Sequence, residues 1–349
     1  MHRPNRRAIM GLTFGALVCA LGAGPADAQI VNIERLSDRV LVANALFLGR
    51  SNVVAVSTRK GLLLIDTGYT PSITARLKQE IEKQFGRKDW AYVIHTHAHE
   101  HVGGDVVFKD VPILAHENIP GEIKRLVDYL ASEEKRAPQM RFIQGKEQEL
   151  QRQIDSGAQN SETLKAQLTV WQERERELAK GFEVPVPAVR FSEDMTLDMG
   201  DVTAQALYLG RGHSLSDVVI YIPEEELLVS GGTCHPFFPK VSDATRLSDL
   251  KRSIAVLDRV LDAGVEHVVA GHAEVAGRPI VERWRNYHRD LLAAVTAAHD
   301  QGLTLEKAQA QLSLGQRFPY MRDVEARFGG TREEIQTANV AAVWKLVQQ

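Results

Sequence analysis

The segment His95-Thr96-His97-Ala98-His99-Glu100-His101, followed by Val102-Gly103-Gly104, places four histidines at alternate positions directly after an apolar run, Trp90–Ile94. In an extended chain, side chains two residues apart point the same way, so this spacing directs several imidazole nitrogens toward one point. Imidazole is the commonest protein ligand of zinc and related metals. Because the whole chain has only 12 histidines, the cluster favours a metal site over a solvated histidine-rich loop.

The first 28 residues have the features of a secretory signal peptide. Three arginines at positions 3, 6 and 7 precede an apolar stretch from Ile9 to Ala23, and Ala26-Asp27-Ala28 offers a small-x-small cleavage site. The stretch is too short for a stable membrane span. The adjacent arginines leave the twin-arginine route and ordinary secretion equally open. We therefore expect a periplasmic or secreted protein without a membrane span.

The composition of the remaining chain narrows the possible partners. The three arginines and one aspartate of the signal carry a net charge of +2, so the formal charge falls from −3 to −5 on cleavage. Such mild acidity gives no reason to expect nucleic acid as a partner, and we expect a small-molecule substrate. Cys19 leaves with the signal and Cys234 remains alone, which predicts no internal disulfide in an oxidising compartment.

The order of the predicted elements is that of an α/β domain. Patterns typical of β-strands occur in residues 29–116, where a helical stretch from Ser72 to Phe85 interrupts them, and again in residues 183–280. Residues 281–349 indicate several further helices, one of which begins at a capping box, Thr331–Glu334.

Residues 117–182 separate the two parts of this domain and are dominated by Glu, Gln, Lys and Arg. We interpret them as an inserted helical hairpin. One helix presents Leu164, Leu168, Trp171 and Leu178, the facing helix presents Phe142, Leu150 and Ile154, and Ser161 is the expected N-cap after the turn. A solvated arm, a lid over the site and a contact in a homo-oligomer all remain open for this hairpin.

Two further histidines follow predicted strands, in Gly212-His213-Ser214 after Leu209 and in Gly271-His272 after Ala270. Together with Ile65-Asp66-Thr67-Gly68 and the histidine segment, they resemble the metallo-β-lactamase superfamily over essentially the whole sequence after the signal. The resemblance implies an αββα sandwich with a metal site along one edge. The helical insertion and the C-terminal helices would be additions to that fold.

Two departures from the family pattern concern carboxylates. The pattern T-H-x-H-x-D-H-x-G-G is here T-H-A-H-E-H-V-G-G, so the aspartate is missing. A second register takes His95 and His97 as the first pair and puts His99 and Glu100 in the Asp and His positions, but it displaces the threonine and both glycines. We favour the deletion. Many relatives also have S-G-D where this chain has Gly232 in the third position.

The resemblance implies a three-imidazole zinc site with an open fourth position. The candidate metal ligands are His97, His99, His101, His213, His272 and Cys234, and the candidate catalytic residues are Glu100 and His272. In this interpretation Glu100 replaces the lost aspartate as ligand or general base, and Asp66 orients a ligand histidine. His101 and His272, with Cys234, would hold a second metal, or the two histidines would relay protons. An inert buried thiol is the alternative for Cys234, and His235 is a weaker ligand candidate.

The function expected from these features is a secreted zinc-dependent hydrolase that uses a metal-activated water on an ester, lactone, lactam or sulfate-ester bond. One or two zinc ions per chain are expected, and iron is not excluded. The missing carboxylates motivate an alternative, a non-hydrolytic metal-binding accessory protein on the same fold. An iron oxygenase acting on persulfides is disfavoured, because relatives of that kind keep a carboxylate ligand. The fold by itself does not fix the substrate.

Overall fold

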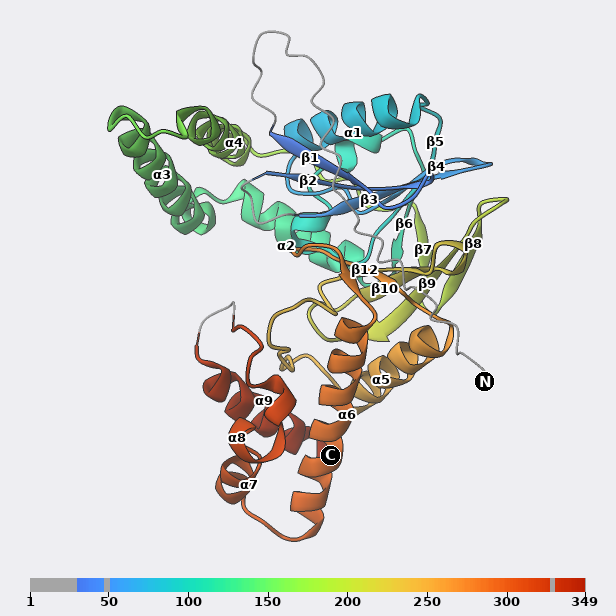
Figure 1. Cartoon of the computed structure of the whole chain (residues 1–349), viewed down its shortest axis with the longest axis vertical. Helices are drawn as coiled ribbons and strands as arrows, with labels where there is room; N and C mark the ends of the chain where they lie inside the picture. The colour runs from blue at the N-terminus through green and yellow to red at the C-terminus, as the bar shows by residue number, and fades with distance from the viewer. Residues whose placement is uncertain (1–29, 47–50, 327–329, 349) are drawn as a thin grey trace, which may run out of the picture.

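The computed structural model of the chain describes residues 30–46, 51–326 and 330–348, without the side chain of Glu100. The signal peptide expected at residues 1–28, with Cys19, lies outside these ranges. Figure 1 shows two stacked sheets with helices on their outer faces, a helical arm on one side and a helical region at one end.

Two mixed sheets form the centre of the molecule. The first has the strand order β1-β2-β3-β4-β5-β6-β7, and the second has the order β13-β12-β11-β10-β9-β8. The strands are β1 (Val31–Arg35), β2 (Val40–Ala45), β3 (Val53–Thr58), β4 (Gly61–Ile65), β5 (Trp90–Ile94), β6 (Ile113–His116), β7 (Val189–Phe191), β8 (Met195–Asp198), β9 (Thr203–Gly210), β10 (Asp217–Ile222), β11 (Leu227–Gly231), β12 (His267–Ala270) and β13 (Ala276–Gly277).

Strands β2, β3 and β4 of the first sheet are buried on both faces, as their nearly continuous apolar sequences require. Along β2, Val40 and Val42 face the second sheet, while Leu41 and Ala43 face helix α1 (Pro71–Phe85). This division follows from the two-residue period of side chains along a strand. The inner residues of both sheets, such as Val54 and Ile220, join in one core between the sheets.

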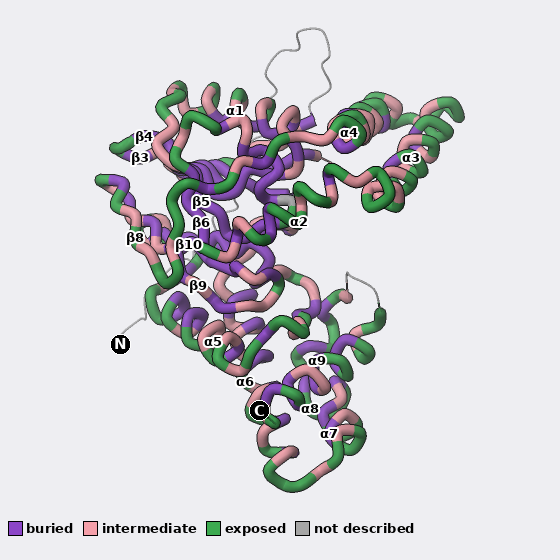
Figure 2. Tube along the Cα trace, turned by 180° about the vertical axis from the view of Figure 1, so that it is seen from behind, coloured by how far each residue is buried: buried purple, intermediate pink, exposed green. Residues whose placement is uncertain are grey.

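The second sheet is covered on its outer face by helices α5 (Leu247–Asp262) and α6 (Pro279–Asp300). Leu257 and Val281 pack there against outward side chains of the sheet, including Val219. The layers are therefore helix, sheet, sheet, helix, and the predicted αββα sandwich is confirmed. Figure 2 shows the sheets as the most buried part of the chain.

The insertion folds as three helices, α2 (Ile119–Ala131), α3 (Glu133–Asp155) and α4 (Ser161–Lys180). Helices α3 and α4 form the predicted hairpin and project from the sandwich in Figure 1. Phe142 of α3 meets Trp171 of α4, with 5.8 Å between ring centroids, although Phe142 is 52% exposed; the neighbouring Ile143 is fully buried. Ser161 is the first helical residue, and Asn160 holds the N-cap position without a side-chain hydrogen bond.

Helices α7 (Leu305–Gln311), α8 (Leu314–Arg317) and α9 (Arg332–Val347) pack with α6 around a separate apolar cluster at the C-terminal end. The capping box of α9 is confirmed, because Thr331 and Glu334 exchange backbone and side-chain hydrogen bonds. Within the described part of the chain, none of the helices combines the length and the apolarity needed to cross a bilayer.

Candidate metal centre

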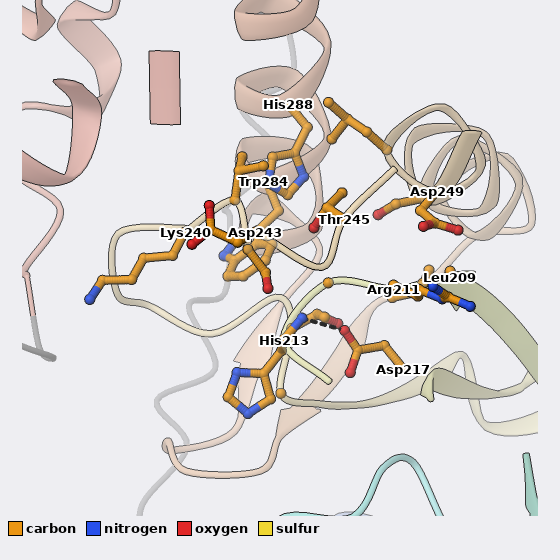
Figure 3. A pocket seen from close by; sticks show the side chains of 18 of the residues that line it. Leu209, Arg211, His213, Asp217, Lys240, Asp243, Thr245, Asp249, Trp284 and His288 are labelled. Atoms are coloured by element: carbon orange, nitrogen blue, oxygen red, sulfur yellow. Dashed lines mark hydrogen bonds between the residues drawn. The ribbon is translucent and has the colours of Figure 1, made fainter. Parts of the chain in front are cut away.

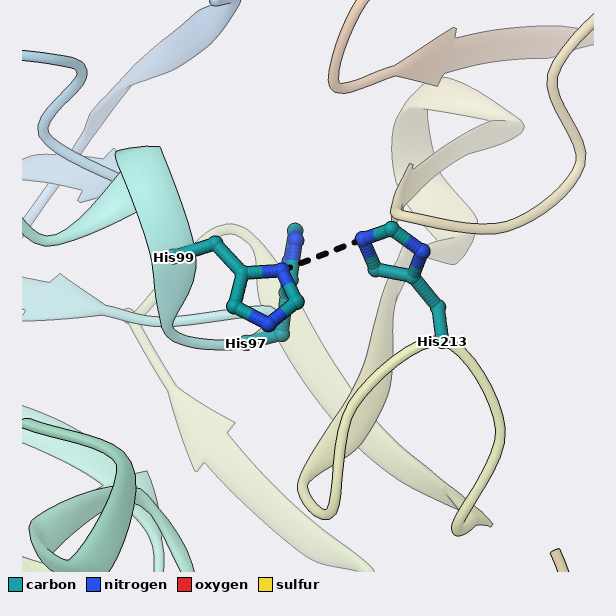
Figure 4. Close-up of side chains that lie close together, drawn as sticks. All are labelled: His97, His99 and His213. Atoms are coloured by element: carbon teal, nitrogen blue, oxygen red, sulfur yellow. Dashed lines mark hydrogen bonds between the residues drawn. The ribbon is translucent and has the colours of Figure 1, made fainter. Parts of the chain in front are cut away.

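Three histidines converge at one edge of the two sheets (Figure 4). His97 follows β5, His99 begins a short 3₁₀ helix, His99–His101, and His213 lies in the loop between β9 and β10. One ring nitrogen from each of the three lies within 4.8 Å of the other two, and Nδ1 of His99 is 3.2 Å from Nε2 of His213. His99 has a φ of 64°, a left-handed conformation that is uncommon outside glycine and clusters at functional sites.

The ring of His97 is oriented by its neighbour Thr96. The hydroxyl of Thr96 donates to Oδ2 of Asp66 at 2.7 Å, so its oxygen is left to accept from Nδ1 of His97 at 3.0 Å. This arrangement leaves Nε2 of His97 unprotonated. That atom is buried and has no hydrogen-bond partner among the described residues. Burial and the neighbouring imidazoles hold the pKa of His97 well below its usual value, which keeps a lone pair available for a metal.

Asp66, at the end of β4, lies beneath the histidine segment. Besides Thr96, its oxygens lie 3.3 Å from Nδ1 of His101 and 3.5 Å from Nδ1 of His95. Although burial opposes it, these contacts hold the pKa of Asp66 well below its usual value. The aspartate therefore remains charged and orients the loop, as expected for a carboxylate behind metal ligands.

His95 does not join the three converging histidines. It is fully buried, and its Nε2 lies 3.0 Å from Oδ1 of Asp105. Burial lowers the pKa of His95, but the charges of Asp105 and Asp66 outweigh it and raise that pKa to about 10. The structure thus groups His97 with His99, which is the pairing expected if the family's aspartate is deleted from the motif. It places His95 between two carboxylates.

A second pair of histidines adjoins the first group. Nε2 of His101 lies 3.3 Å from Nε2 of His272, and the rings of His97 and His101 are 4.4 Å apart between centroids. His272 follows β12 and is half-buried. The predicted histidines His97, His99, His101, His213 and His272 therefore all lie in one region of the structure.

The two expected carboxylate positions contain no acidic side chain that the structure describes. Gly232 follows β11 directly beside His213, and a Cβ added to it would overlap the imidazole ring. With this backbone, an aspartate at position 232 would displace the side chain of His213. Glu100, the predicted replacement, has a side chain outside the described part of the structure.

Cys234 is placed away from the histidines. Its side chain is fully buried in the apolar cluster formed by the outer face of the second sheet, α5 and α6, together with residues such as Val219 and Trp284. Burial raises the pKa of the thiol to about 12. The structure thus places Cys234 in the apolar core. This placement agrees with the alternative interpretation, in which its thiol is inert. His235 turns its ring edge toward Trp284, with 4.7 Å between ring centroids.

The loop that carries His213 is held from two sides. Oδ2 of Asp217 accepts from the backbone N–H of His213 at 2.6 Å. From the insertion, Glu122 accepts from the N–H of Leu215 at 3.1 Å and from the hydroxyl of Ser216. Burial and the nearby charge of Glu122 raise the pKa of Asp217 to about 7, against the effect of its hydrogen bonds.

A cavity of about 570 Å³ opens beside the histidines. His99, His213 and His272 line one side of it, and the insertion supplies much of the opposite side. The lining residues from the insertion and its exit are Leu126, Tyr129, Leu130, Gln139, Arg174, Leu178 and Phe182. The insertion therefore forms part of the wall, which is the arrangement expected of a lid.

Sequence reasoning missed the parts played by Asp105, Glu122 and Arg174. Asp105 follows the two glycines of the motif, and no recurring spacing or motif in the sequence marks it as a functional residue. Glu122 and Arg174 belong to helices rich in charged residues, where their spacing does not distinguish them from solvated side chains. Only the folded arrangement brings them to the site.

Comparisons with known proteins agree with this geometry. The sequence pattern of the Metallo-beta-lactamase superfamily matches residues 46–272. The chain is 26% identical over 264 residues to the metallo-beta-lactamase type 2 of Bacillus cereus, which covers 72% of this chain and 80% of that protein. It is 25% identical over 209 residues to the type 2 enzyme of Bacillus sp. (strain 170), which covers 58% of this chain and 59% of that protein.

Among solved structures, the stereoselective inverting sec-alkylsulfatase Pisa1 from Pseudomonas sp. superposes with a TM-score of 0.53 at 15% identity, covering 90% of this chain and 50% of that one. This likeness concerns the fold. The superfamily pattern spans more than half of the chain, including strands β3 to β12 and the histidines of the site, His97, His99, His101, His213 and His272. The chain therefore belongs to the metallo-β-lactamase superfamily and is a hydrolase of that superfamily.

Proposed function

We propose that this hydrolase is an exported zinc enzyme in which His97, His99 and His213 hold one metal ion. The observation that carries the proposal is the convergence of three imidazole nitrogens within 4.8 Å, one of which is buried without a partner among the described residues. Three protein ligands with an open position are the pattern of catalytic zinc sites. When bound, the metal supplies Lewis acidity, which activates water near neutral pH and polarises the substrate's carbonyl or sulfuryl oxygen.

His272 is the proposed proton donor. Because Asp66 lies against Nδ1 of His101 at 3.3 Å, that nitrogen carries the proton and Nε2 of His101 is an acceptor. Nε2 of His272, 3.3 Å away, then holds the hydrogen between the two rings. His272 also lines the cavity. Once its other ring nitrogen has taken up the proton released by the attacking water, the imidazolium can pass that proton to the leaving group. Binding a second metal between these two histidines is the alternative use of the pair.

The cavity favours an ester or lactone with an apolar acyl part. Its wall contains Leu126, Leu130 and Leu178 from the insertion and Phe237 from the opposite side. Arg174 is a cation in this wall, and its guanidinium lies over the ring of Tyr69 at 4.7 Å. Lactams react at the same kind of carbonyl carbon, and sulfate esters react at sulfur or at the alkyl carbon; both belong in the same test.

The first experiment is to measure metal content by mass spectrometry on the mature protein, purified without chelator or added zinc. We expect about one zinc per chain, or about two if His101 and His272 bind a second ion. His99→Ala should lose the metal together with hydrolysis of 4-nitrophenyl esters. His267→Ala, a matched change at an exposed histidine of β12, should keep both.

Other outcomes of that experiment would change the proposal. Iron in place of zinc would contradict the assigned metal. Bound zinc without turnover of esters, lactones, nitrocefin or 4-nitrophenyl sulfate would favour the non-hydrolytic accessory protein, whose motivation is the absence of the two usual carboxylates. Export to the periplasm or medium is tested separately, by sequencing the N-terminus of the protein recovered from cell fractions.

A further inference from the structure

A second cavity, of about 430 Å³, lies between the loops of the second sheet and the C-terminal helices (Figure 3). Its walls include Trp284 and His288 from α6 and Ile335 from α9. It shares His213, Gly232 and His235 with the first cavity. The two cavities therefore meet at a proposed metal ligand, one bounded by the insertion and the other by the C-terminal helices.

Two polar side chains of this second cavity have groups without partners. Thr245 and His288 are each only 7% exposed. Neither Oγ1 of Thr245 nor Nδ1 of His288 has a hydrogen-bond partner among the described residues. Buried polar groups are nearly always paired, and an exception in a native structure indicates a missing water or ligand. Both residues line the same cavity, so one ligand group can satisfy both.

The surroundings of these two groups suit a flat, uncharged molecule. Trp284 meets the ring of His288 edge-on, 5.5 Å between centroids, and Phe238 and Leu250 add apolar surface to the wall. Burial lowers the pKa of His288 to about 4, so the imidazole is neutral at neutral pH and can accept one hydrogen bond. A volume of this size is typical of a small-molecule site.

The charged residues of the cavity carry both signs. Arg211, Asp217, Lys240, Asp243 and Asp249 line it, and Figure 3 shows Asp243 and Asp249 to either side of Thr245, with Lys240 and Arg211 further out. Two cations and three carboxylates nearly balance, so the lining does not require a charged ligand. The oxygens of Asp217 are occupied by backbone N–H groups of its own loop. The ligand group beside Thr245 and His288 is therefore expected to be neutral.

We propose that the second cavity binds a neutral hydroxylated ring, in its simplest form a phenol. Its hydroxyl group donates to Nδ1 of His288 and its oxygen accepts from the hydroxyl of Thr245. If the proposed hydrolase function holds, on which this part rests, the ring is the phenol released when water cleaves an aryl ester, and the first cavity holds the acyl part. His288 and Trp284 lie beyond residues 46–272, which match the superfamily, while Thr245 lies within them, so the cavity combines the shared fold with the C-terminal helices.

The test is a calorimetric titration of the mature, zinc-loaded protein with phenol and, separately, with toluene. We expect phenol to bind about five- to tenfold more tightly, the ratio expected for one net hydrogen bond. Thr245→Val and His288→Leu should each weaken phenol binding by a similar factor without affecting toluene. Thr70→Val is the matched control, because Thr70 is equally buried, has an unpartnered Oγ1 among the described residues, and lines the first cavity.

Equal affinities for phenol and toluene would overturn the proposal, as would unchanged phenol binding in Thr245→Val. Loss of phenol binding in Thr70→Val alone would also overturn it, by placing the ring in the first cavity. Failure of the hydrolase proposal has a different signature. Phenol would then still bind the wild-type protein and respond to the Thr245 variant, while no phenyl ester would be turned over.

Discussion

Glu122, in the inserted helix α2, accepts a hydrogen bond at 3.1 Å from the backbone N–H of Leu215, two residues after the proposed ligand His213. The side chain of Asn118, just before the same helix, donates to the carbonyl oxygen of Leu215 at 2.7 Å. Both backbone groups of Leu215 are thus held by the insertion. The insertion therefore does more than cover the cavity: it positions the loop from which His213 reaches the metal.

This relationship predicts an effect of Glu122→Ala on metal affinity. The change leaves the N–H of Leu215 and the hydroxyl of Ser216 unpaired and frees the loop of His213. We expect zinc affinity to fall by about 10- to 100-fold, the usual effect of removing a group that orients a ligand. A competition titration with a chromophoric chelator measures it. Glu134→Ala, at an exposed position of α3, is the control, and equal affinities in the two variants would contradict the positioning role.

The sequence predicted the sandwich and the main histidine group because both depend on local patterns. The alternation along strands such as β2 determines which residues face each side, and the spacing of His97 and His99 places them in one loop after β5. The same reasoning cannot find Glu122, since its role depends on a helix of the insertion folding back onto a loop about 90 residues later. The burial of Cys234 was not predictable for a similar reason, because a residue near the motif can still turn into the apolar core.

Phe142 and Ile143 show a further limit of periodicity. Both are apolar and adjacent on α3; the sequence pattern selected Phe142, whose ring meets Trp171 of α4, and missed Ile143, which is fully buried. The choice depends on how α3 lies against α2 and α4, where Ile143 joins a cluster with Ile123 and Leu178. Packing between helices that are rich in charged residues is weakly encoded in the hydrophobic pattern.

His95→Gln tests the register of the histidine segment. His95 lies between the carboxylates of Asp66 and Asp105, and its loss leaves a buried charge without its partner. We expect the free energy of unfolding to fall by about 3–5 kcal/mol, measured by urea denaturation, with the zinc content of the folded protein unchanged. A variant that folds but binds no zinc, while His99→Ala retains it, would instead support the register that begins at His95.

Cys234→Ala should leave the zinc content and the catalytic rate unchanged, because the thiol lies in the apolar cluster of the second sheet. The native thiol should also resist modification by a disulfide reagent at pH 8. Burial raises its pKa to about 12, so only about one thiol in 10⁴ is in the reactive thiolate form at that pH. Rapid labelling of the folded protein, or loss of zinc in the variant, would return Cys234 to the metal site.

Leu126→Ala tests whether the insertion selects the acyl part of the substrate. Leu126 is a half-buried residue of α2 in the wall of the first cavity, and its truncation removes apolar contact from a long acyl chain but little from a short one. We expect kcat/KM for a hexanoate ester to fall by about tenfold, an effect of about 1.4 kcal/mol, with the acetate ester within about twofold. Val127→Ala, at the exposed neighbouring position, should change neither value.

The burial of His288 predicts that the free energy of unfolding depends on pH. Its pKa is lowered from 6.5 to about 4 by burial, so between these values the unfolded chain binds a proton that the folded protein does not. Stability linked to His288 is therefore present in full above pH 6.5 and is lost as the pH falls toward 4. At pH 5.5 the expected loss is about 1.4 kcal/mol relative to pH 7.5.

Urea denaturation of the metal-free protein at pH 7.5 and pH 5.5, compared with His288→Leu, isolates this contribution. The leucine variant cannot take up the proton, so its stability should fall by about 1.4 kcal/mol less than that of the wild-type protein over the same interval. Other titrating groups affect both proteins equally and cancel in the difference. Identical losses would mean that the imidazole of His288 reaches solvent in the folded protein, and the second cavity would then lack the buried neutral acceptor on which phenol binding depends.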